Sequence, residues 1–411
     1  MRVKAIACGR LPHFLVRQAQ ALLLMAEPEV RLDQFLAAAL AGDLAIWPGE
    51  WSDEASWAAL IERANYHGIT GLLFECKLHL GSWPDEVKAV LRERAIARAH
   101  WELRHKFVVS NVLTGLADQG ILAIILKGTA FAYDLYETPS ARERGDTDIL
   151  VARADLEQAR QELQQLGFFR DPLSEGVPDN LHLQEVWSFA TDDGMNHVVD
   201  LHWQAMNSLA LEDALPLSDC MQDPVELPRL CKAARGMDWK IALLHACMHR
   251  AAHITSPYIV GGVTYYGGDR LIWANDIDLL VDKLAAEDWH GLCAKARERG
   301  VEAVLLDGLK FAQARLGTPV PGTVMASLAG GSAKTAASSW LLRSGQAGRA
   351  VSDLKASPGL RGKLDFLIMR VLPTQTFMRQ KYPGMNRYPL ALLYLRRMVD
   401  LVRKRPKRSG R

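Results

Sequence analysis

Cysteine is scarce in this chain of 411 residues, which contains only six. The six are scattered and form no C-x-x-C pair, which argues against a zinc ribbon and against a disulfide framework in so long a chain. Cysteine usage of this kind is typical of a reducing compartment. We therefore expect a cytoplasmic protein.

Long apolar runs are also missing. No stretch approaches the roughly 18 to 20 apolar residues that span a bilayer, and the run FLVRQAQALLLMA is interrupted by Arg17 and Gln18. The apolar string that precedes Arg10 is too short for the core of a signal peptide. We expect no membrane span.

An excess of charge of one sign is missing too, because 49 Lys or Arg nearly balance 47 Asp or Glu and leave a net charge of +2. A basic cluster does occur in residues 403–411, RKRPKRSGR, which hold six Lys or Arg. Short basic ends of this kind are usually solvated. A nucleic-acid partner is therefore not expected.

The remaining composition, 49% hydrophobic and 23% charged, is that of a folded protein long enough for two or three domains. Helical periodicity and strand-like runs predict an α+β fold, in which a small mixed β-sheet is embedded in mainly helical N- and C-terminal parts. The expected division is a helical region 1–118, an α/β core 119–215, a helical region 216–300 packing on the core, and a helical region 301–411 with the basic tail.

Two similar strings, RGDTDILV and ANDIDLLV, each contain an Asp-x-Asp pair. Side chains two apart share a face on a strand, whereas on a helix they diverge by about 200°. Asp146 and Asp148 run into a β-branched strand, so they can converge on one metal ion. Asp276 and Asp278 lie in a helical pattern, and we expect them to cap the helix or face solvent.

A third carboxylate is predicted on a strand of a β-hairpin. The segment QEVWSFATDDGMNHVVDLHW has two alternating runs around an Asp-Asp-Gly turn. Its second run places Val198, Asp200 and His202 on one face. A metal-binding strand pair and a further strand carboxylate are thus both expected within the α/β core.

A candidate anion site precedes the first Asp pair. The apolar run ILAIIL predicts a buried strand, and a helix is expected directly after it. Lys127, Gly128 and Thr129 therefore lie on a strand-to-helix turn. Free backbone N–H groups and the helix dipole at such a turn favour a phosphate.

Three histidines recur at a spacing of four in LLHACMHRAAH, which puts His245, His249 and His253 along one side of a helix. The segment lacks the Glu of a zinc-protease helix, so no general base accompanies the histidines. We expect them to pack against the sheet or to line a nucleotide or acceptor pocket. A His-based metal hydrolase is a weaker alternative.

The order of strand, Gly-bearing turn, helix, Asp-x-Asp strand and later strand Asp resembles the DNA polymerase β-like nucleotidyltransferase superfamily. Within it, LKGTAFAYDLYETPSARERGDTDILV, VVDLHW, and LLHACMHRAAH followed by DRLIWANDIDLL resemble a family of uncharacterised bacterial nucleotidyltransferases. The resemblance extends over roughly residues 50 to 290.

The resemblance implies a polymerase β-like core and a Mg²⁺-dependent nucleotidyltransferase with one or two ions and an NTP such as ATP as substrate. Asp146 and Asp148 match the metal-binding pair, and Asp200 matches the third metal-binding carboxylate, which helps to activate the acceptor hydroxyl. The positions that match nucleotide contacts are Lys127, Gly128, Thr129 and Arg142.

The acceptor that the resemblance implies is a hydroxyl-bearing molecule of unidentified class, either a small molecule, a peptide or a protein. An alternative is that the fold serves as a catalytically silent binding or scaffold protein of a biosynthetic complex. The presence of all three carboxylates favours the enzyme.

Overall fold

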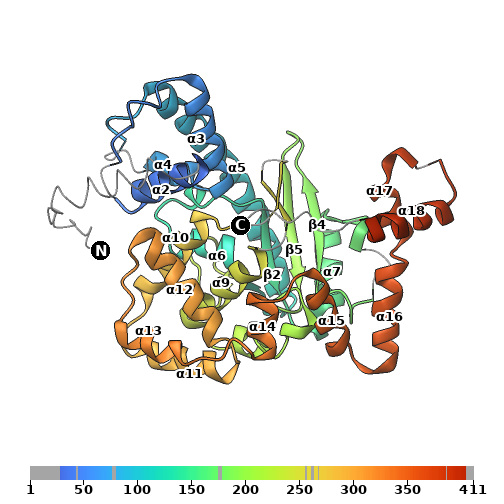
Figure 1. The fold of residues 1–411 in the computed structure, drawn as a ribbon. Coiled ribbons are helices and arrows are strands. Elements are labelled where there is room, and N and C mark those ends of the chain that lie inside the picture. The colour runs from blue at the N-terminus through green and yellow to red at the C-terminus, as the bar shows by residue number, and fades with distance from the viewer. Residues whose placement is uncertain are drawn as a thin grey trace.

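The structure is a computed structural model, and it confirms the expected α+β class: helices surround a seven-stranded mixed sheet (Figure 1). Residues 28–403 are described, with the exception of positions 43–44, 76–79, 175–177, 255–256, 261–262, 267 and 386. The basic cluster at 403–411 therefore lies almost wholly outside the described residues.

The central sheet has the strand order β3-β4-β5-β2-β1-β7-β6. The predicted hairpin forms as the antiparallel pair β4 and β5, whereas β5 runs parallel to β2, and β1 is antiparallel to β2. A separate antiparallel pair consists of β8 and β9. The strands are β1 (Ile124–Ile125), β2 (Asp146–Leu150), β3 (Phe169–Arg170), β4 (Gln184–Ala190), β5 (Asn196–His202), β6 (Val225–Glu226), β7 (Arg235–Gly236), β8 (Pro257–Val260) and β9 (Val263–Tyr266).

Alternation along β2 and β5 separates an apolar face from a polar one. Ile149, Val199 and Leu201 are fully buried on one face, where α5 and α7 cover the sheet. Asp148 and Asp200 are cross-strand partners on the other face. The parallel register thus brings together two carboxylates that are 52 positions apart in the sequence.

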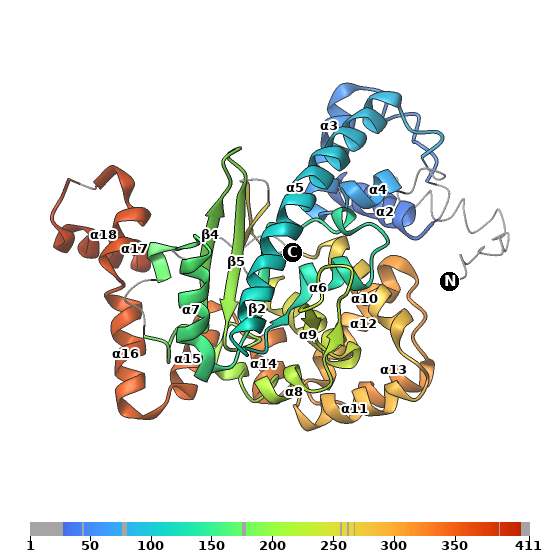
Figure 2. The same cartoon turned by 180° about the vertical axis from the view of Figure 1, so that it is seen from behind.

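The N-terminal helices lie at one end of the sheet, and the long helix α5 runs from them across the sheet (Figure 2). A hydrogen bond from the Leu271 backbone N–H to His67 Nδ1, 3.1 Å long, joins this region to the start of α10. The helices up to the hairpin are α2 (Pro28–Leu40), α3 (Glu54–His67), α4 (Thr70–Glu75), α5 (Asp85–Asp118), α6 (Lys127–Asp134) and α7 (Leu156–Gln165).

The helices after the hairpin form two groups on opposite sides of the sheet (Figures 1 and 2). Helices α9, α10 and α12 pack on one another, although the predicted division places α12 in a different region from α9 and α10. The helices are α8 (Leu217–Met221), α9 (Trp239–His253), α10 (Leu271–Lys283), α11 (Asp288–Glu298), α12 (Glu302–Leu316), α13 (Gly322–Ala329), α14 (Ala336–Leu342), α15 (Gln346–Ala356), α16 (Gly359–Val371), α17 (Gln375–Lys381) and α18 (Leu390–Arg403).

Helices α16 to α18 lie on the other side of the sheet from α9, α10 and α12, near β4 and α7 (Figure 1). Helix α16 contacts α15, and α17 contacts α18 and the short turn at Pro172–Ser174. Among the described residues, no helix is both long and apolar enough to cross a membrane.

Candidate functional site

The polar face of β2 and β5 gathers the candidate metal ligands. One ligand atom from each of Asp148, Asp200 and His202 lies within 4.8 Å of the others. Asp148 is buried, Asp200 is half-buried, and the Gln184 amide donates a 3.1 Å hydrogen bond to Asp200 Oδ2. Asp146 lies two residues before Asp148 on β2 and so shares its face. The structure therefore brings the two strands' carboxylates to one place.

His202 is a site residue that the sequence reasoning placed on the right face but did not name as a ligand. Its Nε2 lies 3.0 Å from Asp148 Oδ1, and the imidazole is buried. The signal in the sequence is its position two residues after Asp200 on the same strand.

Lys127 reaches the same carboxylate from the start of α6. Its Nζ lies 3.0 Å from Asp148 Oδ1. Lys127 also has a backbone φ of 25°, which is unfavourable for a residue with a side chain, and strained positions of this kind are concentrated at functional sites. The predicted strand-to-helix turn is confirmed, and it delivers a cation to the carboxylates.

Burial and mutual repulsion shift the three carboxylates differently. Burial raises the pKa of Asp148, but the charges of Lys127 and His202 outweigh burial and hold that pKa below its usual value. Burial, together with the charges of Asp146 and Asp148, raises the pKa of Asp200 to about 8. Burial and Asp148 likewise raise the pKa of Asp146. The site thus holds more negative charge than its own cations neutralise.

Hard carboxylate oxygens at this density are the donor set that Mg²⁺ takes in proteins, with part of its coordination left for substrate phosphates. The raised pKa of Asp200 shows that negative charge is unfavourable there without a further cation. The residues present therefore fit a divalent cation.

The side chain of Thr129 points away from the carboxylates. Its hydroxyl accepts a 2.8 Å hydrogen bond from Arg144 Nε and lies 2.8 Å from the Thr147 hydroxyl, and the residue is 1% exposed. Any phosphate contact by Thr129 must use its backbone N–H. The adjoining Gly128 is also buried in the first turn of α6.

Arg142 is held by the second Asp-x-Asp string. Its Nε and Nη2 donate to the two oxygens of Asp276 at 2.9 and 2.6 Å, and Asp276 also accepts a 2.7 Å hydrogen bond from the Tyr136 hydroxyl. The string is helical as expected, but the expectation that Asp276 caps the helix or faces solvent is wrong, because the residue is 3% exposed. Most of the Arg142 guanidinium is occupied, and its nucleotide contact stays a prediction.

The α9 histidines lie close enough to the site to sense its charges. Burial, and next the charge of Lys127, lowers the pKa of His245 to about 3 and that of His253 to about 4. The His249 ring centre is 4.3 Å from that of His253 and 5.9 Å from that of Trp273. These three histidines do not form a three-ligand metal group in the part of the chain that the structure describes.

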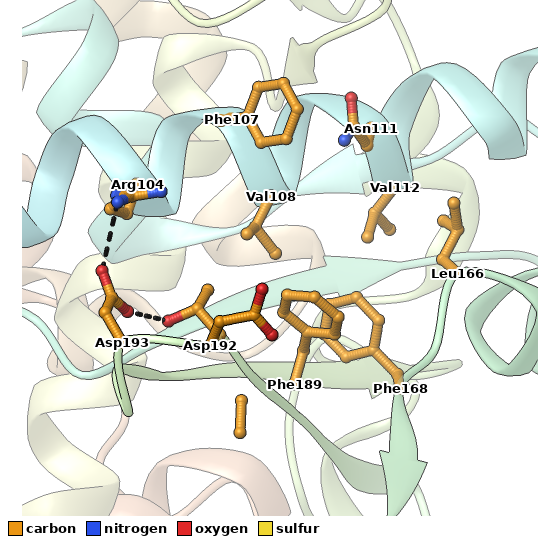
Figure 3. Close-up of a pocket in the computed structure, with 12 residues that line it drawn as sticks. Arg104, Phe107, Val108, Asn111, Val112, Leu166, Phe168, Phe189, Asp192 and Asp193 are labelled. Atoms are coloured by element: carbon orange, nitrogen blue, oxygen red, sulfur yellow. Dashed lines mark hydrogen bonds and ion pairs between the residues drawn. The ribbon is translucent and has the colours of Figure 1, made fainter.

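A separate hollow of about 380 Å³ lies between α5 and the β4–β5 hairpin. Figure 3 shows Phe107, Phe168 and Phe189 around it, with Arg104 paired to Asp193 at its rim. Because Phe189 is the cross-strand partner of His197, it lies on the face of the sheet opposite to Asp200. The hollow is therefore not part of the carboxylate site.

Comparison with protein families shows that residues 53–317 match a model described as an uncharacterised nucleotidyltransferase. This range contains the whole sheet, α9 and α10, and it ends one residue after α12. No curated protein matches the chain.

Proposed function

Because the chain belongs to this nucleotidyltransferase family, we propose that it transfers a nucleoside monophosphate from an NTP to a hydroxyl group of an acceptor, with Mg²⁺ held by Asp146, Asp148 and Asp200. The observation that carries the proposal is the β2–β5 register, which pairs Asp148 with Asp200 beside Lys127. Phosphoryl chemistry needs mainly positioned charge, and this arrangement supplies it.

The proposed metal role rests on the three carboxylates. A bound Mg²⁺ supplies neutralisation of the triphosphate charge. His202, 3.0 Å from Asp148, orients that carboxylate. Gln184 does the same for Asp200 through its amide.

The transfer step assigned to the chain's own groups begins with the acceptor hydroxyl. Asp200 takes the proton of this hydroxyl, because its carboxylate lies on β5 directly beside Asp148 and so borders the place where the acceptor would meet the nucleotide. The hydroxyl oxygen forms a bond to the α-phosphorus, the bond from the α-phosphorus to the bridging oxygen of the leaving group breaks, and pyrophosphate leaves.

Phosphate binding is assigned to the first turn of α6. The Lys127 ammonium contacts Asp148, and a triphosphate bound at this turn would give it a second anionic partner. The N–H groups of Lys127, Gly128 and Thr129 begin the helix and have no intrahelical acceptor. The rings of His249, His253 and Trp273 are assigned to the wall of the nucleotide or acceptor pocket.

Calorimetric titration with a panel of NTPs, with and without Mg²⁺, tests the proposal. We expect Mg²⁺-dependent binding of at least one NTP to the wild type, and loss of this binding in Asp148→Asn. The matched control is Asp278→Asn, because it removes the same charge from the second residue of the other Asp-x-Asp string. If no NTP binds under either condition, the proposal is overturned and the scaffold alternative takes its place.

A further inference from the structure

Helix α16 carries five aliphatic side chains on a face that is open to solvent. Leu360, Leu364, Leu367, Ile368 and Val371 are between 44% and 88% exposed. Their offsets of 0, 4, 7, 8 and 11 positions place them on one stripe of the helix. Such a stripe normally faces the core, so this surface is built to be covered by something else.

Helix α18 presents a second stripe. Leu392, Leu395, Met398 and Val399 are between 42% and 61% exposed, and their offsets of 0, 3, 6 and 7 again share a side. We refer to α16, α17 and α18, residues 359–403, as the C-terminal arm.

The C-terminal arm is held together by its own internal contacts. Its exposed stripes are therefore surfaces of a packed structure. Met378 and Leu393 are fully buried. The Tyr394 hydroxyl donates to the Pro373 carbonyl at 2.7 Å, and Arg397 Nη2 donates to the Arg370 carbonyl at 3.1 Å. The stripes on α16 and α18 remain after these contacts are made.

Positive charge is concentrated in the same part of the chain. Residues 359–411 contain fourteen Lys or Arg and two Asp, a surplus of twelve positive charges. The net charge of the whole chain is +2, so residues 1–358 carry a net charge of −10. The sequence thus divides into an acidic part that contains the carboxylate site and a basic, apolar-striped part.

We propose that the C-terminal arm docks on an anionic lipid surface, with the stripes of α16 and α18 in the interface and the surrounding Lys and Arg on the headgroups. Apolar side chains on one face with basic residues around them are the physical requirement for a helix that lies in the membrane plane. Six of these fourteen basic residues lie in the basic cluster at 403–411, and such a cluster adds attraction to anionic lipids.

Charge and chemistry favour this occupant over two others. A nucleic acid would use the positive charge but gives no partner to an aliphatic stripe. A second copy docked arm to arm would cover the stripes but would place two strongly positive surfaces against each other. An anionic lipid surface satisfies both features at once.

The test is flotation of the full-length protein with vesicles of phosphatidylcholine alone and of phosphatidylcholine mixed with phosphatidylglycerol. We expect binding to the mixed vesicles, weaker binding at high salt, and little binding to phosphatidylcholine alone. The variant Leu364→Glu with Ile368→Glu should weaken binding roughly tenfold or more, since it places charge in the stripe. The matched control, Leu103→Glu with Phe107→Glu, has the same spacing of four, changes apolar residues on α5 that are still more exposed, and should bind like the wild type.

Circular dichroism and Mg²⁺-dependent NTP titration of the stripe variant keep the result separate from the nucleotide site, because the arm contributes no residue to that site. The proposal is overturned if the mixed vesicles do not bind the protein, or if the α5 control loses binding equally. It is also overturned if light scattering shows that the wild type is a dimer and that the stripe variant is a monomer. Binding of the full-length protein to duplex DNA but not to vesicles would overturn it as well.

Discussion

Lys127 and Asp148 form an ion pair at the centre of the carboxylate site, with Nζ 3.0 Å from Oδ1. The same oxygen lies 3.0 Å from His202 Nε2. An ammonium group therefore lies against the oxygen that is proposed to bind Mg²⁺. If the proposed function is correct, Lys127 would compete with the metal for this oxygen until a bound triphosphate gave the ammonium another partner.

Removal of this competition should change metal and nucleotide affinity in opposite directions. In Lys127→Met, we expect Mg²⁺ alone to bind roughly tenfold more tightly, which corresponds to about 1.4 kcal/mol, because the site loses a cation. NTP binding in the presence of Mg²⁺ should weaken because the phosphate contact is lost. Calorimetric titration of each ligand measures both effects.

Lys127→Arg is the control for the charge, and it should keep Mg²⁺ affinity near the wild-type value. A parallel loss of Mg²⁺ and NTP affinity in Lys127→Met would contradict the competition and would indicate that Lys127 only maintains the structure of the turn.

Stability in the absence of metal should fall as the pH rises from about 5 to 8. The pKa of Asp200 is about 8 in the folded protein and near 3.8 in an unfolded chain, so over this range the folded state holds a proton that the unfolded state has lost. The free energy of unfolding therefore decreases with pH. Urea denaturation with a chelator present, at several pH values, measures this slope.

Asp200→Asn should flatten the slope, because the amide does not titrate. Asp193→Asn is the comparison at an exposed carboxylate, whose pKa lies below its usual value because Thr191 donates a hydrogen bond to it, so the slope should persist. A slope that is unchanged in Asp200→Asn would assign the effect to Asp146 or to another group.

Local signals in the sequence were enough to predict most of the elements around the site. The apolar run before Lys127, the turn at residues 191–195 and the end of α5 near Gly120 all depend on neighbouring residues. The choice between the two Asp-x-Asp strings also follows from local periodicity, and the structure confirms a strand for one and a helix for the other.

The partners of individual polar groups could not be predicted in this way. Arg142 and Asp276 are 134 positions apart, and no pattern in either segment indicates that they meet. The Thr129 hydroxyl points away from the carboxylates because it forms hydrogen bonds with Arg144 and Thr147. Both are tertiary contacts. Sequence periodicity predicts the face of a residue, whereas its partner depends on the packing of distant elements.

The Arg142–Asp276 pair should be important for stability independently of any contact with nucleotide. Arg142→Met leaves a buried carboxylate without its main partner, and we expect a loss of about 3 to 5 kcal/mol in the free energy of unfolding. Arg142→Met combined with Asp276→Leu removes both charges and should recover most of the loss. Urea denaturation of the two variants measures this difference.

The double variant also tests the predicted nucleotide contact of Arg142. If it folds stably and binds NTP with Mg²⁺ like the wild type, Arg142 serves the structure only. If it folds stably but binds NTP more weakly, the guanidinium contributes to nucleotide binding through N–H groups other than those that bond Asp276 and the Glu143 carbonyl. A double variant no more stable than Arg142→Met would contradict the stability argument.

Gly308 should be intolerant of a methyl group although it lies inside a helix, where Gly→Ala is normally stabilising. A Cβ at Gly308 on α12 would lie 2.4 Å from Cys247 Sγ and 2.8 Å from Cys247 Cβ on α9. Gly308 and Cys247 are both buried. We expect Gly308→Ala to destabilise the protein by about 1 to 3 kcal/mol, since the two helices must separate.

Gly291→Ala on α11 is the matched control, because its Cβ would approach no atom more closely than 3.8 Å. The control should be neutral or stabilise by up to about 1 kcal/mol. Thermal or urea unfolding of both variants measures the contrast, and equal stability of the two would mean that α9 and α12 are packed less closely than the structure has them.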